Sequence, residues 1–148
     1  MKVLIANRRA RFEYEILERL VAGIALTGSE VKSVREGRVN LQDGFVLFER
    51  GEAFLVNVHI APYHHAGYAN HEPLRRRKLL LHRREAHRLA GKVAEKGLTV
   101  LPLAIGVEGN WIKVELALGR GKKLHDKRET LKRRTLDREA EAAVKERR

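Results

Sequence analysis

The feature that most constrains the fold is a period of two in the apolar side chains of the segment 52–60. Every second position is apolar, namely Phe54, Val56, Val58 and Ile60. The positions between them are Leu55, Asn57 and His59. Because successive side chains of a strand point to opposite faces, a period of two indicates a half-buried β-strand. The sequence therefore predicts one strand over 52–60 that buries the face carrying Phe54 and Ile60.

Two pairs of strand-like segments follow each other closely enough to form hairpins. The bulky run 45–48 stands between Gly44 and Gly51, and residues 50–52 read as a turn into the strand at 52–60. A second pair, 98–107 and 111–118, is joined by residues 108–110. In its second segment Ile112, Val114 and Leu116 alternate with Lys113, Glu115 and Ala117. Short connections of this kind join antiparallel strands, so both pairs are expected to be antiparallel.

Two helices are expected from their end signals. Thr27 and Glu30 have the spacing of a capping box and Gly37 supplies a stop, which predicts a helix over 29–36 that buries Val31 and Val34. A second helix is predicted over 83–96 before Gly97. Its apolar face consists of Ala86, Leu89, Ala90 and Val93.

Residues 12–26 fit two alternatives. Phe12, Tyr14 and Ile16 alternate with acidic residues as in a strand, whereas the apolar positions from 16 to 24 also follow helical spacing. The alternating start and Gly23 favour a long bent strand. Residues 63–77 lack periodicity and are expected to form a long loop. Five or six strands with two short helices indicate a mainly β (α+β) chain that forms a small antiparallel barrel.

The last thirty residues cannot form a core of their own. Of the net charge of +12 carried by 148 residues, half lies in 119–148, where twelve Lys and Arg face six Asp and Glu. This segment has no aromatic side chain, so burial cannot offset an ordering entropy of about 1–2 kcal/mol per residue. We expect one domain over 1–118 and a basic tail over 119–148. A tail of this kind is typical of proteins that bind a polyanion.

Several classes of function are disfavoured by the composition. The chain has no cysteine, which excludes disulfides, thiolate zinc sites and a cysteine nucleophile. No apolar run approaches the ~18 residues of a membrane span, so a cytoplasmic protein without a membrane partner is expected. His64, His65 and His71 share one loop, but their spacing is a weak metal signal, and no metal or other cofactor is expected. A nuclease site could be drawn from Glu30, Asp43 and His59, but nothing in their spacing requires one. No nucleotide-binding or hydrolase motif occurs either, so the chain is not expected to be an enzyme.

Basic clusters favour RNA as the partner. Arginines and a lysine fill 75–78 just before a leucine run, and residues 7–11 hold three more arginines. Guanidinium groups pair with phosphate through two parallel hydrogen bonds. The chain has only one Trp, three Tyr and four Phe, and it lacks the aromatic motif of single-strand readers. A protein that reads the shape of a folded RNA is therefore favoured.

Four segments, in this order and spacing, closely resemble the small protein B (SmpB) family of bacterial trans-translation. They are GIALTGSEVKSVR (23–35), NVHIAPY (57–63), RRRKLLL (75–81) and GKKLHDKR (121–128). The resemblance extends over nearly the whole chain. It implies an oligonucleotide-binding-like antiparallel β-barrel with two to three helices and a C-terminal tail that is disordered when free.

The resemblance also implies a function and partners. The chain would bind the tRNA-like domain of tmRNA and, with elongation factor Tu, deliver it to stalled ribosomes for rescue and peptide tagging. On the ribosome it would contact the decoding centre, and its tail would fold as a helix in the mRNA channel. The alternative is a different barrel-type ribosomal or ribosome-associated RNA-binding protein that acts structurally.

Site residues follow from the resemblance by position. The RNA-facing candidates are Glu30, Lys32, Arg35, Asn57, His59, Tyr63, Arg75, Arg77, Lys78 and Lys113. The ribosome-facing candidates in the tail are Lys122, Lys123, His125, Asp126, Lys127, Arg128, Arg133 and Arg134. Because a carboxylate repels phosphate, Glu30 has two equally supported roles: contact with RNA, or a purely structural role in capping the helix. The chain departs from the family pattern after Asp43, where a small residue with a hydroxyl or methyl group is expected and Gly44 is found.

Overall fold

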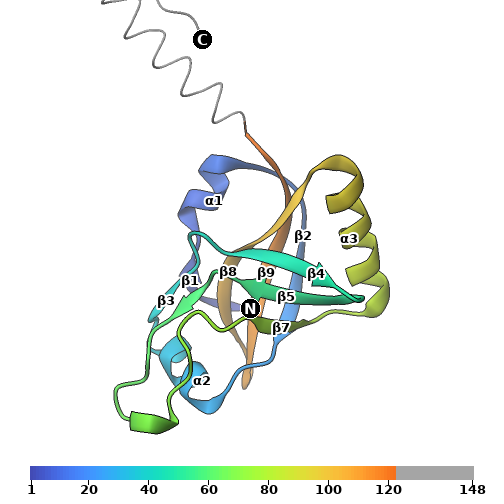
Figure 1. The fold of residues 1–148 in the computed structure, drawn as a ribbon. Coiled ribbons are helices and arrows are strands. Elements are labelled where there is room, and N and C mark those ends of the chain that lie inside the picture. The colour runs from blue at the N-terminus through green and yellow to red at the C-terminus, as the bar shows by residue number, and fades with distance from the viewer. Residues whose placement is uncertain (123–148) are drawn as a thin grey trace, which may run out of the picture.

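A computed structural model of the chain describes residues 1–122 (Figure 1). Its strands are β1 (Lys2–Ala6), β2 (Tyr14–Ile24), β3 (Val39–Asn40), β4 (Phe45–Glu49), β5 (Glu52–Val56), β6 (His59–Ile60), β7 (Arg77–Leu80), β8 (Thr99–Glu108) and β9 (Trp111–Gly121). Its helices are α1 (Arg8–Glu13), α2 (Gly28–Arg35), α3 (Arg83–Lys96) and the 3₁₀ turn η1 (Gly67–Ala69). The expected mainly β class with short helices is confirmed.

Seven strands form one antiparallel sheet in the order β1-β8-β9-β2-β7-β5-β4, and β3 pairs with β6 beside it. The sheet curls so that β4 also contacts β8, which makes the expected barrel (Figure 1). Its interior is filled by aliphatic side chains from every wall, including the fully buried Leu55, Ile105 and Leu116. The helix α2 closes this interior with Val34, and α3 adds Leu89.

Both predicted hairpins are present. The turn between β4 and β5 holds Arg50 and Gly51 at φ of 55° and 80°, and such paired left-handed residues match the twist of the strands they join. The turn between β8 and β9 follows the pair Glu108 and Trp111, with Gly109 at φ 62°. Local turn chemistry therefore determined these two pairings.

The prediction of one continuous strand over 52–60 was wrong. The strand β5 ends at Val56, and Asn57 adopts a left-handed conformation with φ 61°. This residue changes which side chains face the core: Ala53 and Leu55 are buried before it, whereas Val58 and Ile60 are buried after it. A left-handed residue rotates the chain direction, so a pattern that looks continuous in sequence is divided between two sheets.

The ambiguous segment 12–26 is a long strand from Tyr14 onward, but Phe12 and Glu13 end a short helix, α1, that the sequence did not predict. The side chain of Asn7 caps α1 by accepting from the Ala10 amide at 3.2 Å. The amide group of Asn7 also donates to the carbonyls of Leu41 and Pro102, at 3.1 and 2.9 Å. These two carbonyls fix the position of α1. Because they lie far from Asn7 in the sequence, no local sequence pattern predicts the helix.

The other two helices lie where the sequence predicts them. The helix α2 begins at Gly28, and Val34 is fully buried while Val31 is half-buried. The helix α3 ends at Gly97, which adopts the left-handed conformation that stops a helix, with φ 64°. Within residues 1–122 no helix has the length and apolar character needed to cross a membrane.

Two further expectations are modified. A Cβ at Gly44 would lie 2.5 Å from Cγ2 of Val58 and 3.0 Å from Cγ of Pro102, so the methyl or hydroxyl expected there does not fit. The barrel also continues past the predicted boundary at residue 118, because β9 pairs with β2 as far as Gly121. The remainder of the predicted tail, 123–148, lies outside the described residues.

Candidate RNA interface

A buried carboxylate organises the surface around α2. Glu30 closes a capping box: its Oε1 accepts from the Thr27 amide at 2.8 Å, and its own amide donates to Oγ1 of Thr27 at 3.5 Å. The same carboxylate accepts from Arg75 at 2.6 and 3.1 Å and from Nε of Arg77 at 2.7 Å. Since Glu30 and Arg77 are both 0% exposed, the sequence RRRK contributes one arginine to the interior of the protein.

The ionisation of this triad follows from its contacts. Burial by itself raises the pKa of Glu30, but hydrogen bonds from Arg75, the Thr27 amide and Arg77 outweigh burial and hold that pKa at about 2. Burial lowers the pKa of Arg77, an effect that Glu30 opposes. The triad is therefore fully charged at neutral pH, with two cations sharing one anion.

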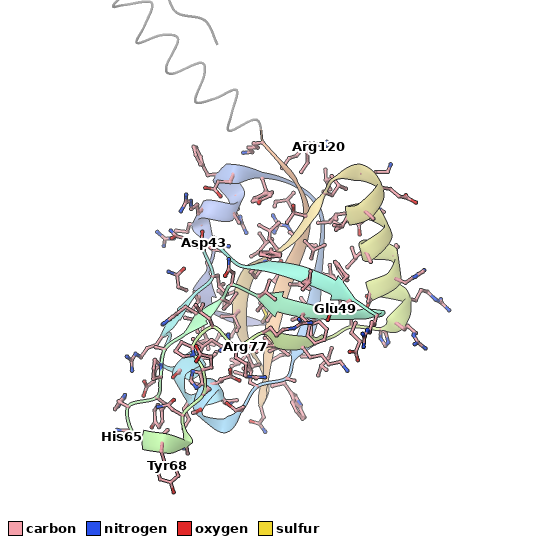
Figure 2. The ribbon with its side chains drawn as sticks, in the orientation of Figure 1. Asp43, Glu49, His65, Tyr68, Arg77 and Arg120 are labelled. Atoms are coloured by element: carbon pink, nitrogen blue, oxygen red, sulfur yellow. The ribbon has the colours of Figure 1, made fainter. Side chains whose placement is uncertain are left out.

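Arg77 connects three parts of the chain. Besides Glu30, its guanidinium donates to the carbonyls of Val58 at 2.8 Å, Pro73 at 3.1 Å and Glu72 at 3.4 Å. Figure 2 shows Arg77 inside the molecule rather than at its edge. Because Arg77 and Glu30 are both 0% exposed, direct contact with RNA does not fit either residue in this conformation. Strand alternation was the missed signal, because Arg77 has the same parity as the buried Leu79.

The loop 61–76 is held at its base and projects at its end. The side chain of Asn70 accepts from the Tyr63 amide at 2.9 Å and donates to the Tyr63 carbonyl at 2.7 Å. Nε2 of His71 donates to the carbonyl of Ile60 at 2.8 Å, since a carbonyl only accepts, and its Nδ1 is hydrogen-bonded to Oγ of Ser29, also at 2.8 Å. Figure 2 shows His65 and Tyr68 pointing away from the barrel at the end of the loop.

Three predicted residues gather beside this loop. Lys32 and Arg35 are exposed on α2, and the ammonium of Lys32 lies 5.4 Å from the centre of the half-buried Tyr63 ring. Arg35 has no ion pair within residues 1–122. His64 adds a ring 5.1 Å from that of Tyr63. Cations and aromatic faces are thus presented together at this surface, which we call the α2 surface.

A hollow adjoins the α2 surface on the side of the β8–β9 turn. It has a volume of about 400 Å³ and is lined by residues that include Val31, Leu80, Trp111 and Lys113. Trp111 is 73% exposed and Leu80 is 57% exposed, so both present apolar surface to solvent at this hollow. The sequence reasoning missed both residues, although Trp111 has the same strand parity as the outward-facing Lys113.

The remaining barrel candidates are spread over other surfaces. Asn57 and His59 are exposed on either side of the buried Val58. Lys78 is exposed on β7 but forms an ion pair with Glu52 at 2.8 Å. These residues are not brought into the hollow that contains Lys113.

Of the tail candidates, the structure describes Lys122. Its amide donates to the Glu13 carbonyl at 2.8 Å and its Nζ to the Arg11 carbonyl at 3.1 Å. The other tail candidates lie outside the described residues: Lys123, His125, Asp126, Lys127, Arg128, Arg133 and Arg134. Within residues 1–122 no three His, Asp or Glu side chains are grouped to hold a metal ion.

Comparison with known proteins gives one consistent result. The family model described as "SmpB protein" matches residues 4–146. An SsrA-binding protein of Nostoc punctiforme is 59% identical over 145 residues, covering 97% of this chain and 94% of its own length. One from a Synechococcus strain is 58% identical over 148 residues, covering 99% of this chain and 96% of its own.

A solved structure agrees in both fold and sequence. It is described as "tmRNA-SmpB: a journey to the center of the bacterial ribosome", and it is 49% identical with a TM-score of 0.71. The match covers 96% of this chain and 97% of the solved one. With a family match over nearly its whole length and relatives close to 60% identical, this chain is a member of the SmpB family.

Proposed function

We propose that this chain binds the tRNA-like domain of tmRNA and delivers it to stalled ribosomes, where a peptide tag is then added. The observation that carries the proposal is the match over residues 4–146 to the SmpB family, together with close relatives that are SsrA-binding proteins. The structure supplies a compatible surface, in which cations and exposed rings lie on a rigid barrel. Delivery with elongation factor Tu, in the cytoplasm where ribosomes work, completes the proposal.

The α2 surface and the adjoining hollow are the proposed RNA-binding site. Lys32, Arg35 and Lys113 would pair with phosphates, and Trp111 offers an exposed ring for stacking against a base or ribose. Tyr68, which is fully exposed at the end of the loop, would extend this contact. The buried Glu30 would hold the loop and α2 in place without touching RNA.

A division into a barrel and a basic tail would give the two parts of the chain separate roles. We propose that residues up to 122 bind tmRNA and that the basic tail acts on the ribosome. The tail residues Lys127, Arg128, Arg133 and Arg134 would gain phosphate partners along the mRNA channel. The function requires no catalysis by this chain, since positive charge and shape are sufficient for the proposed contacts.

A gel-shift competition tests the proposal. The full chain should bind a labelled tRNA-like fragment of tmRNA, and unlabelled ribosomal RNA of equal length should compete poorly. A plot of log affinity against log salt concentration should have a negative slope. With about five phosphate contacts that slope should be about −4, since each contact contributes about 0.7–0.9. Equal competition by both RNAs would favour the structural ribosomal alternative.

A pair of variants tests the site itself. Trp111→Ala should weaken binding by about 1–3 kcal/mol, the usual value of one base stacked on an aromatic ring. Phe45→Ala is the matched control, because it removes a partly exposed ring of β4 that lies outside the hollow. If the two variants bind the tRNA-like fragment equally well, the hollow is not part of the interface.

A further inference from the structure

A second strongly basic surface lies on α3, apart from α2 and the 61–76 loop (Figure 1). The side chains of Arg83, Arg84, His87 and Arg88 line an open hollow of about 740 Å³. Its other wall is Gly51 in the β4–β5 turn, and a Cβ built there would lie 4.0 Å from Nε of Arg83. The proposed tmRNA site uses none of these residues.

The positive charge of this hollow is only partly neutralised. Arg88 donates to both carboxylate oxygens of Glu18, at 2.9 and 3.0 Å, and Lys92 contacts the same carboxylate at 2.7 Å. Arg83 and Arg84 form no ion pair within residues 1–122. The unpaired charge is therefore concentrated at the N-terminal half of α3.

The neighbouring carboxylates are already engaged. Glu85 accepts from the His82 amide at 3.2 Å, and Glu52 forms an ion pair with Lys78 at 2.8 Å. Hydrogen bonds from Lys92 and Arg88 lower the pKa of Glu18, so that carboxylate is committed to its two partners. Lys78 first and Arg83 second lower the pKa of Glu52, so Arg83 shares this carboxylate at longer range, but neither Arg83 nor Arg84 forms an ion pair among residues 1–122.

The arrangement of α3 prevents these arginines from turning inward. Ala86 and Leu89 occupy the buried side of the helix, which fixes Arg84 and Arg88 on the outer side. Like charges four residues apart on a helix cost a few tenths of a kcal/mol. A cluster that repels itself and faces open solvent is stabilised by an anion from outside the chain.

The chemistry of the cluster identifies the kind of anion. Guanidinium groups match phosphate oxygens through paired hydrogen bonds. The hollow is open and its arginines lie on the surface, so it does not enclose a small ion. A long polyanion instead gains from several such contacts at once, because each one releases counterions.

We propose that the N-terminal half of α3 and the β4–β5 turn bind the backbone of a second RNA helix while the α2 surface holds the tRNA-like RNA. Arg83 and Arg84 make the phosphate contacts, and Arg50 of the turn lies on the side of Arg83. This inference rests on the proposed function in that the α2 surface is taken to be occupied by the tRNA-like domain. The second RNA is read through its backbone, so its sequence is not specified.

The test uses the full chain, both free and saturated with the tRNA-like fragment. The probe is a short RNA duplex of mixed sequence, titrated over a range of salt concentrations. The variant Arg83→Ala/Arg84→Ala is compared with Arg19→Ala/Lys96→Ala, which removes the same charge outside the hollow. Thermal melts confirm that both variants are folded.

In the saturated complex, the α3 variant should bind the duplex more weakly than the control. Its salt slope should fall by about 1.4–1.8, the contribution of two phosphate contacts. Its affinity for the tRNA-like fragment should remain that of the unmodified chain.

Equal duplex binding by the α3 variant and its control, in both the free and saturated chain, would overturn the inference. Binding of both variants to small ribosomal subunits is measured as well. If the α3 variant loses that binding but still binds the duplex, the inference is also overturned, since the partner of the α3 surface would then be a protein. If the chain fails to prefer the tRNA-like fragment, the proposed function fails instead. The comparison on the free chain still decides the role of α3 in that case.

Discussion

Replacing Glu30 by Gln tests whether the buried triad stabilises this fold. The substitution keeps the size of the side chain and an oxygen for the Thr27 amide, but it removes the only carboxylate that contacts Arg75 and Arg77 within residues 1–122. Arg77 would then be fully buried with no carboxylate in ion-pair contact among residues 1–122, and with only the more distant charge of Glu72 to oppose its own. Removing one partner of a buried ion pair costs about 3–5 kcal/mol.

The pKa gives an independent value for the same interaction. The pKa of Glu30 is about 2 in the folded chain, against an ordinary value of 4.5. At 1.36 kcal/mol per pKa unit, this depression corresponds to about 3 kcal/mol of stability. The two routes agree, so a loss of about 3 kcal/mol is expected, or roughly 10 °C in melting temperature for a chain of this size.

The sign of the pH dependence follows from proton binding. Below pH about 2 the carboxyl is protonated in both the folded and unfolded states. Between pH 2 and 4.5 the unfolded state binds more protons, so stability rises with pH in this window. Above pH 4.5 the full contribution of Glu30 is present, and it is lost again as the pH falls toward 2.

Urea denaturation at several pH values measures this effect. Glu49→Gln is the matched control, because Glu49 makes the same kind of contact with Arg76, at 2.8 Å, but on the surface, where an ion pair contributes about 0–1 kcal/mol. The stability difference between the unmodified chain and Glu30→Gln should shrink as the pH falls from 4.5 to 2. If the two glutamine variants are equally stable, or if that difference is independent of pH, the reasoning is refuted.

Three further predictions concern the helix cap, the barrel and the tail. Thr27→Ala should cost about 0.5–2 kcal/mol through the lost cap, and Val34→Ala should cost more because Val34 is 0% exposed; equal melting temperatures for the two variants would contradict this order. Gly106→Ala should weaken the pairing of β1 with β8, because the new Cβ would lie 2.1 Å from the Lys2 carbonyl; unchanged amide exchange in β1 would show that the strand adapts. A chain ending at Lys122 should keep its affinity for the tRNA-like fragment but lose tagging on stalled ribosomes, and a large loss of affinity would assign RNA binding to the tail.

The sequence by itself determined the elements whose causes are local. The capping box of Thr27 and Glu30 specified α2, and the apolar face before Gly97 specified α3. The turn at Arg50 and Gly51 specified the first hairpin. In each case the residues that form the element also carry its signal, so neighbours in sequence are sufficient to predict it. The family resemblance supplied the proposed partner in the same way, from contiguous segments.

Only the tertiary structure decided the features that depend on distant groups. Arg77 looks like part of a basic surface run, yet it is buried because Glu30 and the carbonyl of Val58 reach it from other elements. The left-handed Asn57 divides an apparently continuous strand, and α1 depends on acceptors far along the chain. A local pattern records the preference of a side chain for burial or solvent. It does not record which distant partner compensates a charge or a backbone group, and in this chain that compensation decided which arginine of the run 75–77 is buried and which are at least partly exposed.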